Sequence, residues 1–233
     1  MAEIDEELEA FKDGGWRQWA AIDAALERGD IDEAGWFRAV GEIITPAYLS
    51  TENPRAQSGH SGDARRWEGA RRLLLDAVDR DGRFLDVGCA NGHLMECVVA
   101  WAAEDGVVLD PWGLEISEEL AALARERLPH WSDHILVGNA LSWRPPLRFD
   151  YVRTNLEYVP RLRQPDLVGH LLESVVADKG RLIIGVFNEE TDRAACEADV
   201  TAWGYTVSGA TERRHPETDR VVRRAFWIDA AGR

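Results

Sequence analysis

A glycine-containing run near the middle of the chain has the residue types of a ligand-binding turn. The run reads Asp86-Val87-Gly88-Cys89-Ala90-Asn91-Gly92. Its glycines let the backbone approach a ligand closely, because no Cβ atom stands in the way. A dinucleotide site needs G-x-G-x-x-G, and the spacing here differs from that pattern. The Asp86 carboxylate would repel a pyrophosphate but attract ammonium and sulfonium groups. The run therefore predicts a site for a cationic ligand.

Histidines and cysteines are the other residues that could take part in proton transfer or covalent chemistry. His60 and His215 are candidate general bases, because the unperturbed pKa of histidine lies near neutrality. Cys89 has no partner base that the sequence reveals, so a nucleophilic role is not expected. The three cysteines, Cys89, Cys97 and Cys196, lack metal-ligand spacing. Neither a metal site nor a disulfide framework is predicted.

The hydrophobic pattern changes near residue 80 and predicts two parts of the chain. In residues 1–79, apolar residues recur at helical spacing, around Ile4, Trp16 and Trp36. A loop is expected over residues 48–63, followed by a helix over residues 65–78. This part is interpreted as an N-terminal helical extension that forms a lid.

From residue 80 onward, short apolar runs alternate with longer helical patterns. This alternation predicts right-handed crossovers and a parallel sheet with helices on both faces. The last two strands are joined by a connection too short for a crossover helix, so the final strand is expected to run antiparallel. The predicted strands are 84–87, 112–116, 135–137, 149–152, 182–187, 205–210 and 221–228, and the predicted helices are 94–103, 118–128, 166–176 and 191–203.

With the run and the element order in place, residues 80–230 resemble the class I S-adenosylmethionine-dependent methyltransferases. The glycine run, preceded by Leu85, resembles the first motif of that family. The next likenesses are Gly113-Leu114-Glu115-Ile116-Ser117 at the end of the second strand and Gly138-Asn139-Ala140 after the third. Residues 149–152 with 155–160 resemble the fourth strand and its loop, and residues 180–184 the fifth. The resemblance implies a Rossmann-like, doubly wound α/β sheet of seven mostly parallel strands over residues 80–233.

The resemblance also implies that the cofactor is S-adenosylmethionine and assigns residues to it. Glu115 would bind both ribose hydroxyls. Asn139 stands where the family usually has an acid facing the adenine amino group; its amide can still hydrogen-bond the adenine edge, or it can simply shape the turn. Ala90 stands where the family has its middle loop glycine. The implied cofactor-binding residues are Asp86, Gly88, Cys89, Ala90, Gly92, Glu115, Ile116, Asn139, Ala140 and Asn155.

The loop that would face the transferable methyl group reads Asn155-Leu156-Glu157-Tyr158. Family members that methylate amides or exocyclic amines carry Asn/Asp-Pro-Pro-Tyr/Phe here. The prolines are missing, so an amine-aiming role for Asn155 is not favoured. Tyr158 joins His60 and His215 as a candidate catalytic residue, and it joins Tyr48 and Trp67 as a candidate substrate-binding residue. Residues 48–67 are expected to form the lid over the pocket.

Composition narrows the function further. The formal net charge of −15 would repel phosphate backbones and anionic membranes, so neither partner is expected. No apolar run reaches the roughly 20 residues of a membrane span, and a cytoplasmic protein is expected. The leading interpretation is a methyltransferase for an O or N atom of a small metabolite or natural product, with a homodimer left open. The alternatives are a protein or RNA methyltransferase, or an inactive cofactor-binding partner protein; an NAD-dependent oxidoreductase is more distant.

Overall fold

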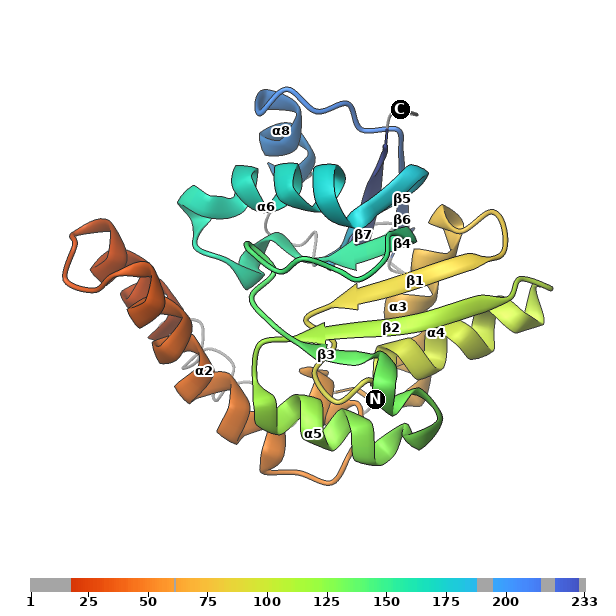
Figure 1. Cartoon of the computed structure of the whole chain (residues 1–233), viewed down its shortest axis with the longest axis horizontal. Coiled ribbons are helices and arrows are strands. Elements are labelled where there is room, and N and C mark those ends of the chain that lie inside the picture. The colour runs from red at the N-terminus through yellow and green to blue at the C-terminus, as the bar shows by residue number, and fades with distance from the viewer. Residues whose placement is uncertain (1–17, 61, 188–194, 215–220, 231–233) are drawn as a thin grey trace.

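The computed structural model describes residues 18–60, 62–187, 195–214 and 221–230 of the chain (Figure 1). Within them, seven strands form one sheet in the order β3-β2-β1-β4-β5-β7-β6. Strands β1 to β5 pair in parallel, and β7 runs antiparallel to both β5 and β6. This is the predicted seven-stranded Rossmann-like sheet with an antiparallel last strand. The strands are β1 (Gly82–Val87), β2 (Leu109–Glu115), β3 (Ile135–Val137), β4 (Phe149–Thr154), β5 (Val176–Phe187), β6 (Gly209–Arg214) and β7 (Val221–Asp229).

Helices cover both faces of the sheet, with α3, α4 and α5 on one side and α6 and α8 on the other (Figure 1). Residues 18–27 are also helical. The predicted helix over 65–78 ends earlier and continues as a 3-10 turn over Arg72–Ala77, and the one over 166–176 continues from α6 as a π turn over Leu171–Val175. The helices are α2 (Glu33–Leu49), α3 (Ala64–Arg71), α4 (His93–Glu104), α5 (Glu118–Arg127), α6 (Gln164–His170) and α8 (Ala195–Ala202).

Two hydrophobic cores lie on opposite faces of the sheet because successive strand residues point to opposite sides. On β1, Phe84 belongs to the core beneath α3 and α4, whereas Leu85 belongs to the core beneath α6 and α8. On β4, Tyr151 and Val152 alternate in the same way. The sheet is therefore buried on both faces, which explains why its strands read as short apolar runs.

The sixth strand lies four residues later in the chain than the sequence predicted. Residues 205–210 were expected to be the strand, but β6 spans Gly209–Arg214. Pairing with β7 fixes this register, since Gly209 lies opposite Trp227. Tyr205 and Val207 are partly buried against the core below α6 and α8, so their apolar pattern reflects packing of a connection.

The segment before β1 is packed into the domain. Trp67 of α3 and Leu73 and Leu74 of the following 3-10 turn are buried in the same core as α4. Further upstream, the Thr45 hydroxyl of α2 donates a hydrogen bond to the Ser117 hydroxyl before α5, at 3.2 Å. The division of the chain into a lid (1–79) and a core (80–233) stays a prediction.

Candidate functional site

The glycine run forms a tight turn between β1 and α4. Gly88, Ala90 and Gly92 all have positive φ angles, of 75°, 48° and 74°. The Gly88 and Cys89 amides both donate to the Leu114 carbonyl of β2, at 2.7 and 3.2 Å. The turn is thereby tied to the neighbouring strand, and Ala90 is held in a conformation that a residue with a Cβ seldom adopts.

Glu115, the last residue of β2, links the glycine turn after β1 to the turn after β2. Its carboxylate accepts hydrogen bonds from the backbone amides of Ala90, Ile116 and Ser117, at 2.8, 2.9 and 3.0 Å. Burial raises the pKa of Glu115, against the lowering effect of these three bonds. An ionised carboxylate offers about four acceptor positions. One position therefore remains for a hydroxyl, and the Ile116 side chain beside it is 48% exposed.

Asn139 shapes the turn after β3, which is one of the two roles that the sequence suggested for it. Its Oδ1 accepts from the Leu141 amide at 2.9 Å, and its carbonyl accepts from the Ser142 and Trp143 amides. The neighbouring Ala140 packs against the core. Among the described residues the Asn139 Nδ2 group has no hydrogen-bond partner, so it remains available as a donor. Adenine contact by Asn139 stays a prediction.

Asp86 is not the open carboxylate that the sequence suggested. Its side chain is 1% exposed, and its Oδ1 accepts from an Arg153 guanidinium nitrogen at 3.1 Å. Burial raises the pKa of Asp86 to about 6, and Arg153 opposes that rise. The negative charge is balanced inside the protein, so the expectation that Asp86 attracts a cationic ligand through free charge is corrected.

Arg153 is the residue that sequence reasoning missed. Besides Asp86 it donates to the Gly185 carbonyl at 2.6 Å, to the Tyr158 hydroxyl at 3.1 Å and to Asn155 Oδ1 at 3.0 Å. A signal was available, because an arginine inside the apolar run of β4 must find a carboxylate if the strand is buried. The register of the sheet supplies it, since Arg153 lies opposite Asp86 on the adjacent strand.

The loop after β4 lies directly on the glycine run. A Cβ atom built on Gly88 would lie 2.5 Å from the Tyr158 ring, so only glycine leaves room for that ring. The Asn155 side chain accepts from Arg153 at 3.0 Å and donates to Glu157 Oε1 at 2.9 Å. Tyr158 thus lies beside the predicted cofactor loop, and Asn155 contacts both Arg153 and Glu157. Cofactor contact by Asn155 stays a prediction.

The strap, residues 50–60 between α2 and α3, is hydrogen-bonded to the glycine run at Asn91. The Asn91 Nδ2 group donates to the Pro54 carbonyl at 3.0 Å and to Gln57 Oε1 at 2.9 Å. The Ser58 hydroxyl donates to Asn91 Oδ1 at 2.6 Å. Because Asn91 and Gln57 are both buried, this polar network fixes the strap to the loop. A segment of the predicted lid therefore contacts the predicted cofactor site.

Other predicted site residues lie elsewhere or are buried. Trp67 is 3% exposed and stacks on His93 at 5.0 Å between ring centroids, so most of its ring is core, and substrate contact by Trp67 stays a prediction. His60 packs edge-on against Trp67, at 5.4 Å between ring centroids. Burial raises the pKa of Cys89 well above its usual range, which keeps the thiol protonated. His215 lies outside the described residues.

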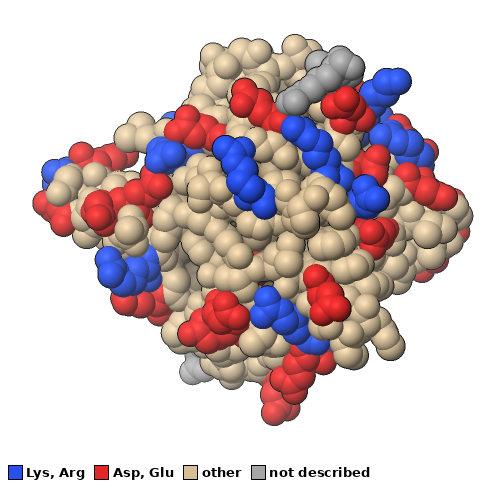
Figure 2. Space-filling view, in the orientation of Figure 1, with Lys and Arg blue, Asp and Glu red and all other residues tan. Residues whose placement is uncertain are grey.

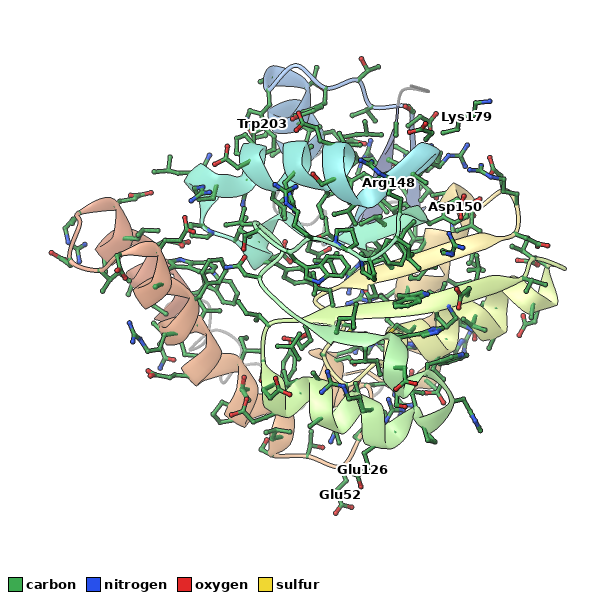
Figure 3. The ribbon with its side chains drawn as sticks, viewed as in Figure 1. Glu52, Glu126, Arg148, Asp150, Lys179 and Trp203 are labelled. Carbon is green, nitrogen blue, oxygen red and sulfur yellow. The ribbon has the colours of Figure 1, made fainter. Side chains whose placement is uncertain are left out.

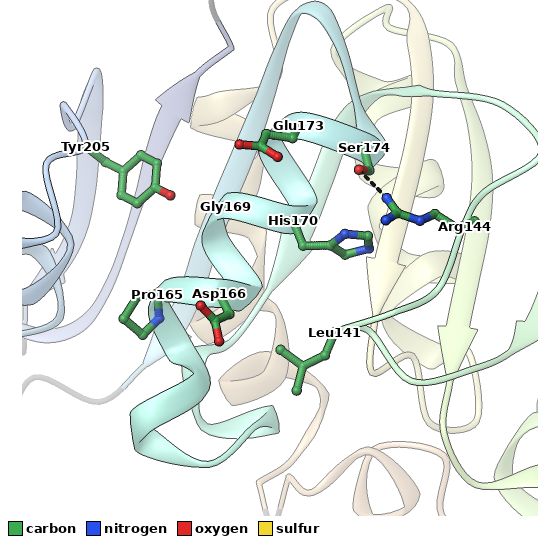
Figure 4. A pocket seen from close by; sticks show the side chains of 9 residues that line it. All are labelled: Leu141, Arg144, Pro165, Asp166, Gly169, His170, Glu173, Ser174 and Tyr205. Carbon is green, nitrogen blue, oxygen red and sulfur yellow. Dashed lines mark hydrogen bonds between the residues drawn. The ribbon is translucent and has the colours of Figure 1, made fainter.

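A separate depression of about 400 Å³ runs along α6 (Figure 4). Polar side chains line much of it, and Arg144 there donates to the Ser174 hydroxyl at 2.6 Å. None of its lining residues belongs to the glycine run or to the loop after β4, so it is not part of the candidate site. The lining residues are Leu141, Arg144, Pro165, Asp166, Gly169, His170, Glu173, Ser174 and Tyr205.

Two further properties concern the described residues as a whole. Among the described residues, no three or more histidine, cysteine, aspartate or glutamate side chains lie together in a way that could hold a metal ion. No helix among these residues is long and apolar enough to cross a membrane. The face shown in Figure 2 carries basic and acidic side chains interspersed.

Solved structures share this fold at low sequence identity. A 1,6-didemethyltoxoflavin-N1-methyltransferase of Burkholderia thailandensis, solved with 1,6-didemethyltoxoflavin and S-adenosylhomocysteine, aligns with a TM-score of 0.63 at 10% identity, covering 86% of this chain and 91% of that one. The cyclase SpnF aligns with a TM-score of 0.57 at 14% identity, covering 83% and 93%. A SAM-dependent methyltransferase of Aquifex aeolicus aligns with a TM-score of 0.53 at 14% identity, covering 77% and 100%.

No family model matches the sequence, and no curated protein sequence matches it significantly. The structural likenesses together with the strand order establish the class of fold. The chain has the Rossmann-like fold of class I S-adenosylmethionine-dependent methyltransferases.

Proposed function

We propose that this chain is an S-adenosylmethionine-dependent methyltransferase that methylates an oxygen or nitrogen atom of a small molecule. The observation that carries the proposal is the contact between Glu115 and the Ala90 amide at 2.8 Å. This contact joins the carboxylate at the end of β2 to the glycine turn that follows β1. Ligands of open α/β folds bind here, beyond the carboxyl ends of the strands. The remaining acceptor position of Glu115 suits a ribose hydroxyl.

The residues at this edge suit a nucleoside. Glu115 would hold the ribose, the exposed Ile116 side chain would pack against the base, and the Asn139 Nδ2 group would donate to the edge of the base. When bound, S-adenosylmethionine supplies a methyl group on a positively charged sulfur. The task of the chain is to hold the acceptor close to that group and to exclude water. Tyr158, whose ring lies on Gly88, would form one wall of the acceptor pocket.

A small acceptor is favoured over RNA by the formal net charge of −15, because this charge opposes the approach of a phosphate backbone. The fold by itself does not decide the reaction, since it also occurs in a protein described as a cyclase. A protein or RNA methyltransferase and an inactive cofactor-binding partner protein are therefore kept as alternatives.

Titration calorimetry with S-adenosylhomocysteine tests the cofactor. The wild-type chain is expected to bind it, and Glu115→Gln is expected to bind about 10- to 100-fold more weakly, because a charged hydrogen-bond acceptor is lost. Glu126→Gln is the matched control, since Glu126 projects from the outer side of α5 and is exposed (Figure 3). Absence of heat with the wild type, or equal affinity of Glu115→Gln, would overturn the proposal.

Methyl transfer is then measured with radiolabelled cofactor and three acceptor pools. We expect labelling of small hydroxyl or amine compounds. Labelling of transfer RNA or of protein in place of small molecules would favour the macromolecular alternative. Binding of the cofactor with no labelling in any pool would favour the inactive partner protein.

A further inference from the structure

Helix α2 crosses the carboxyl ends of the strands and is fixed there at two points. Near its start, Glu33 forms an ion pair with Arg163, in the connection from β4 to α6. Near its end, the Thr45 hydroxyl donates to the hydroxyl of Ser117, which follows β2, at 3.2 Å. Strand β1 lies between β2 and β4 in the sheet, so the middle of α2 passes over the glycine run that follows β1. Figure 1 shows α2 facing the tips of β1 and β2.

One row of residues along α2 points toward the strands. Phe37, Gly41 and Thr45 are spaced four residues apart, so they lie one above the other on the same side of the helix. Phe37 packs against the core beneath α6 and α8, and Thr45 makes the hydrogen bond to Ser117. Because the two outer members of the row contact the domain, Gly41 between them faces it as well. Gly41 is accordingly partly buried, whereas Glu42, the next residue around the helix, is exposed.

The row has an open space at Gly41. No atom of the described residues, apart from the helix itself, lies within 4 Å of a Cβ atom built on Gly41. The space lies between Phe37 and Thr45, since these two side chains occupy the row on either side. In the middle of a helix, glycine is less favourable than alanine by about 1 kcal/mol. The stability of α2 therefore does not explain the glycine, whereas a need for room beneath the helix does.

The surroundings of this space suit a flat apolar group. The polar groups that fix α2 are already engaged, in the ion pair and the hydrogen bond described above. The backbone amides in the middle of an α-helix are bonded within the helix, so Gly41 offers an apolar surface. The ring of Phe37 borders the space along the row, and the ring of Tyr158 lies on Gly88 of the glycine run below. An aromatic ring has flat apolar faces that pack against other rings and against a helix that lacks a side chain.

We propose that the methyl acceptor is an aromatic molecule whose ring lies beneath Gly41, and that Gly41 sets how large this ring system can be. The inference rests on the proposed function, because it names the class of acceptor for that reaction. Gly41 acts by leaving room, so a larger side chain at this position reduces the space from above. The hydroxyl or amine of the acceptor then points down to the glycine run, where the cofactor is expected to bind.

Binding of phenol, 2-naphthol and 9-phenanthrol, which differ in the number of fused rings, measures the size of the space. Each compound is titrated by ligand-observed NMR, with and without S-adenosylhomocysteine. The variants are Gly41→Ala and Gly41→Leu. Gly69→Leu is the matched control, because Gly69 lies on α3, is exposed and likewise has no described atom within 4 Å of a built Cβ.

The wild type is expected to bind the two larger compounds more tightly than phenol, because they bury more apolar surface. Gly41→Leu should bind the larger compounds about 10-fold more weakly or worse through steric overlap, while the affinity for phenol changes by less than about 3-fold. Gly41→Ala should lie in between, and Gly69→Leu should bind all three as the wild type does. Both Gly41 variants should melt at or above the wild-type temperature, since alanine and leucine favour a helix more than glycine does. Loss of folding therefore does not produce the expected result.

The proposal is overturned if the wild type binds none of the three compounds, or if Gly41→Leu binds them as the wild type does. It is also overturned if Gly41→Leu loses phenol as strongly as the larger compounds, or if Gly69→Leu shows the same loss. Failure of the proposed function gives a different result. In that case S-adenosylhomocysteine does not bind to the wild type, while Gly41→Leu still discriminates against the larger rings in its absence.

Discussion

Replacing Arg153 by methionine tests the interior of the candidate site directly. Methionine keeps an unbranched side chain but removes the charge and all the donors. Asp86, which is 1% exposed, would then be left without its partner. The Gly185 carbonyl would lose a 2.6 Å hydrogen bond as well. Removing one partner of a buried ion pair costs about 3–5 kcal/mol, because the other charge stays desolvated.

Chemical denaturation followed by circular dichroism measures this loss. For a chain of 233 residues, a loss of about 3–5 kcal/mol corresponds to a fall in melting temperature of roughly 6–20 °C. Arg163→Met is the matched control, since the Arg163 side chain is 39% exposed although it also contacts two carboxylates, those of Glu33 and Asp166. Such exposed pairs contribute about 1 kcal/mol or less.

A double variant distinguishes the ion pair from a general need for bulk at this position. Asp86→Leu combined with Arg153→Met removes both charges, so we expect it to be more stable than Arg153→Met alone. A single variant within about 1 kcal/mol of the wild type would refute the reasoning. So would a double variant that is less stable than the single one.

Two further predictions concern the same region. Because burial raises the pKa of Asp86 from 3.8 to about 6, protonation of Asp86 favours the folded state. The stability of the wild type relative to Asp86→Asn should therefore fall, by up to about 3 kcal/mol, as the pH rises from about 4 to about 7; a pH-independent difference in denaturation experiments would contradict this. Asn91→Ala removes the contacts to Gln57, Ser58 and Pro54, so it should lower stability by about 2 kcal/mol and speed tryptic cleavage at Arg55. Glu52→Gln, an exposed change in the same strap (Figure 3), should leave cleavage as in the wild type.

The sequence by itself determined the features that depend on neighbouring residues. Apolar runs alternating with helical patterns predicted the antiparallel direction of β7 and six of the seven strands at overlapping positions, although β2 and β5 begin earlier than predicted, at Leu109 and Val176. The glycine run and Glu115 could be identified because each lies at the carboxyl end of a strand. Such signals can be read from the sequence alone, because strand and helix periods are local properties of the chain. The sixth strand was misplaced because pairing with β7, not local pattern, sets its register.

Only the tertiary structure decided which charges meet. Asp86 and Arg153 are 67 positions apart in the chain and come together because β1 and β4 are neighbours in the sheet. That contact turned an apparently open carboxylate into half of a buried ion pair. Burial and charge pairing depend on distances in space, which residue spacing along the chain does not specify.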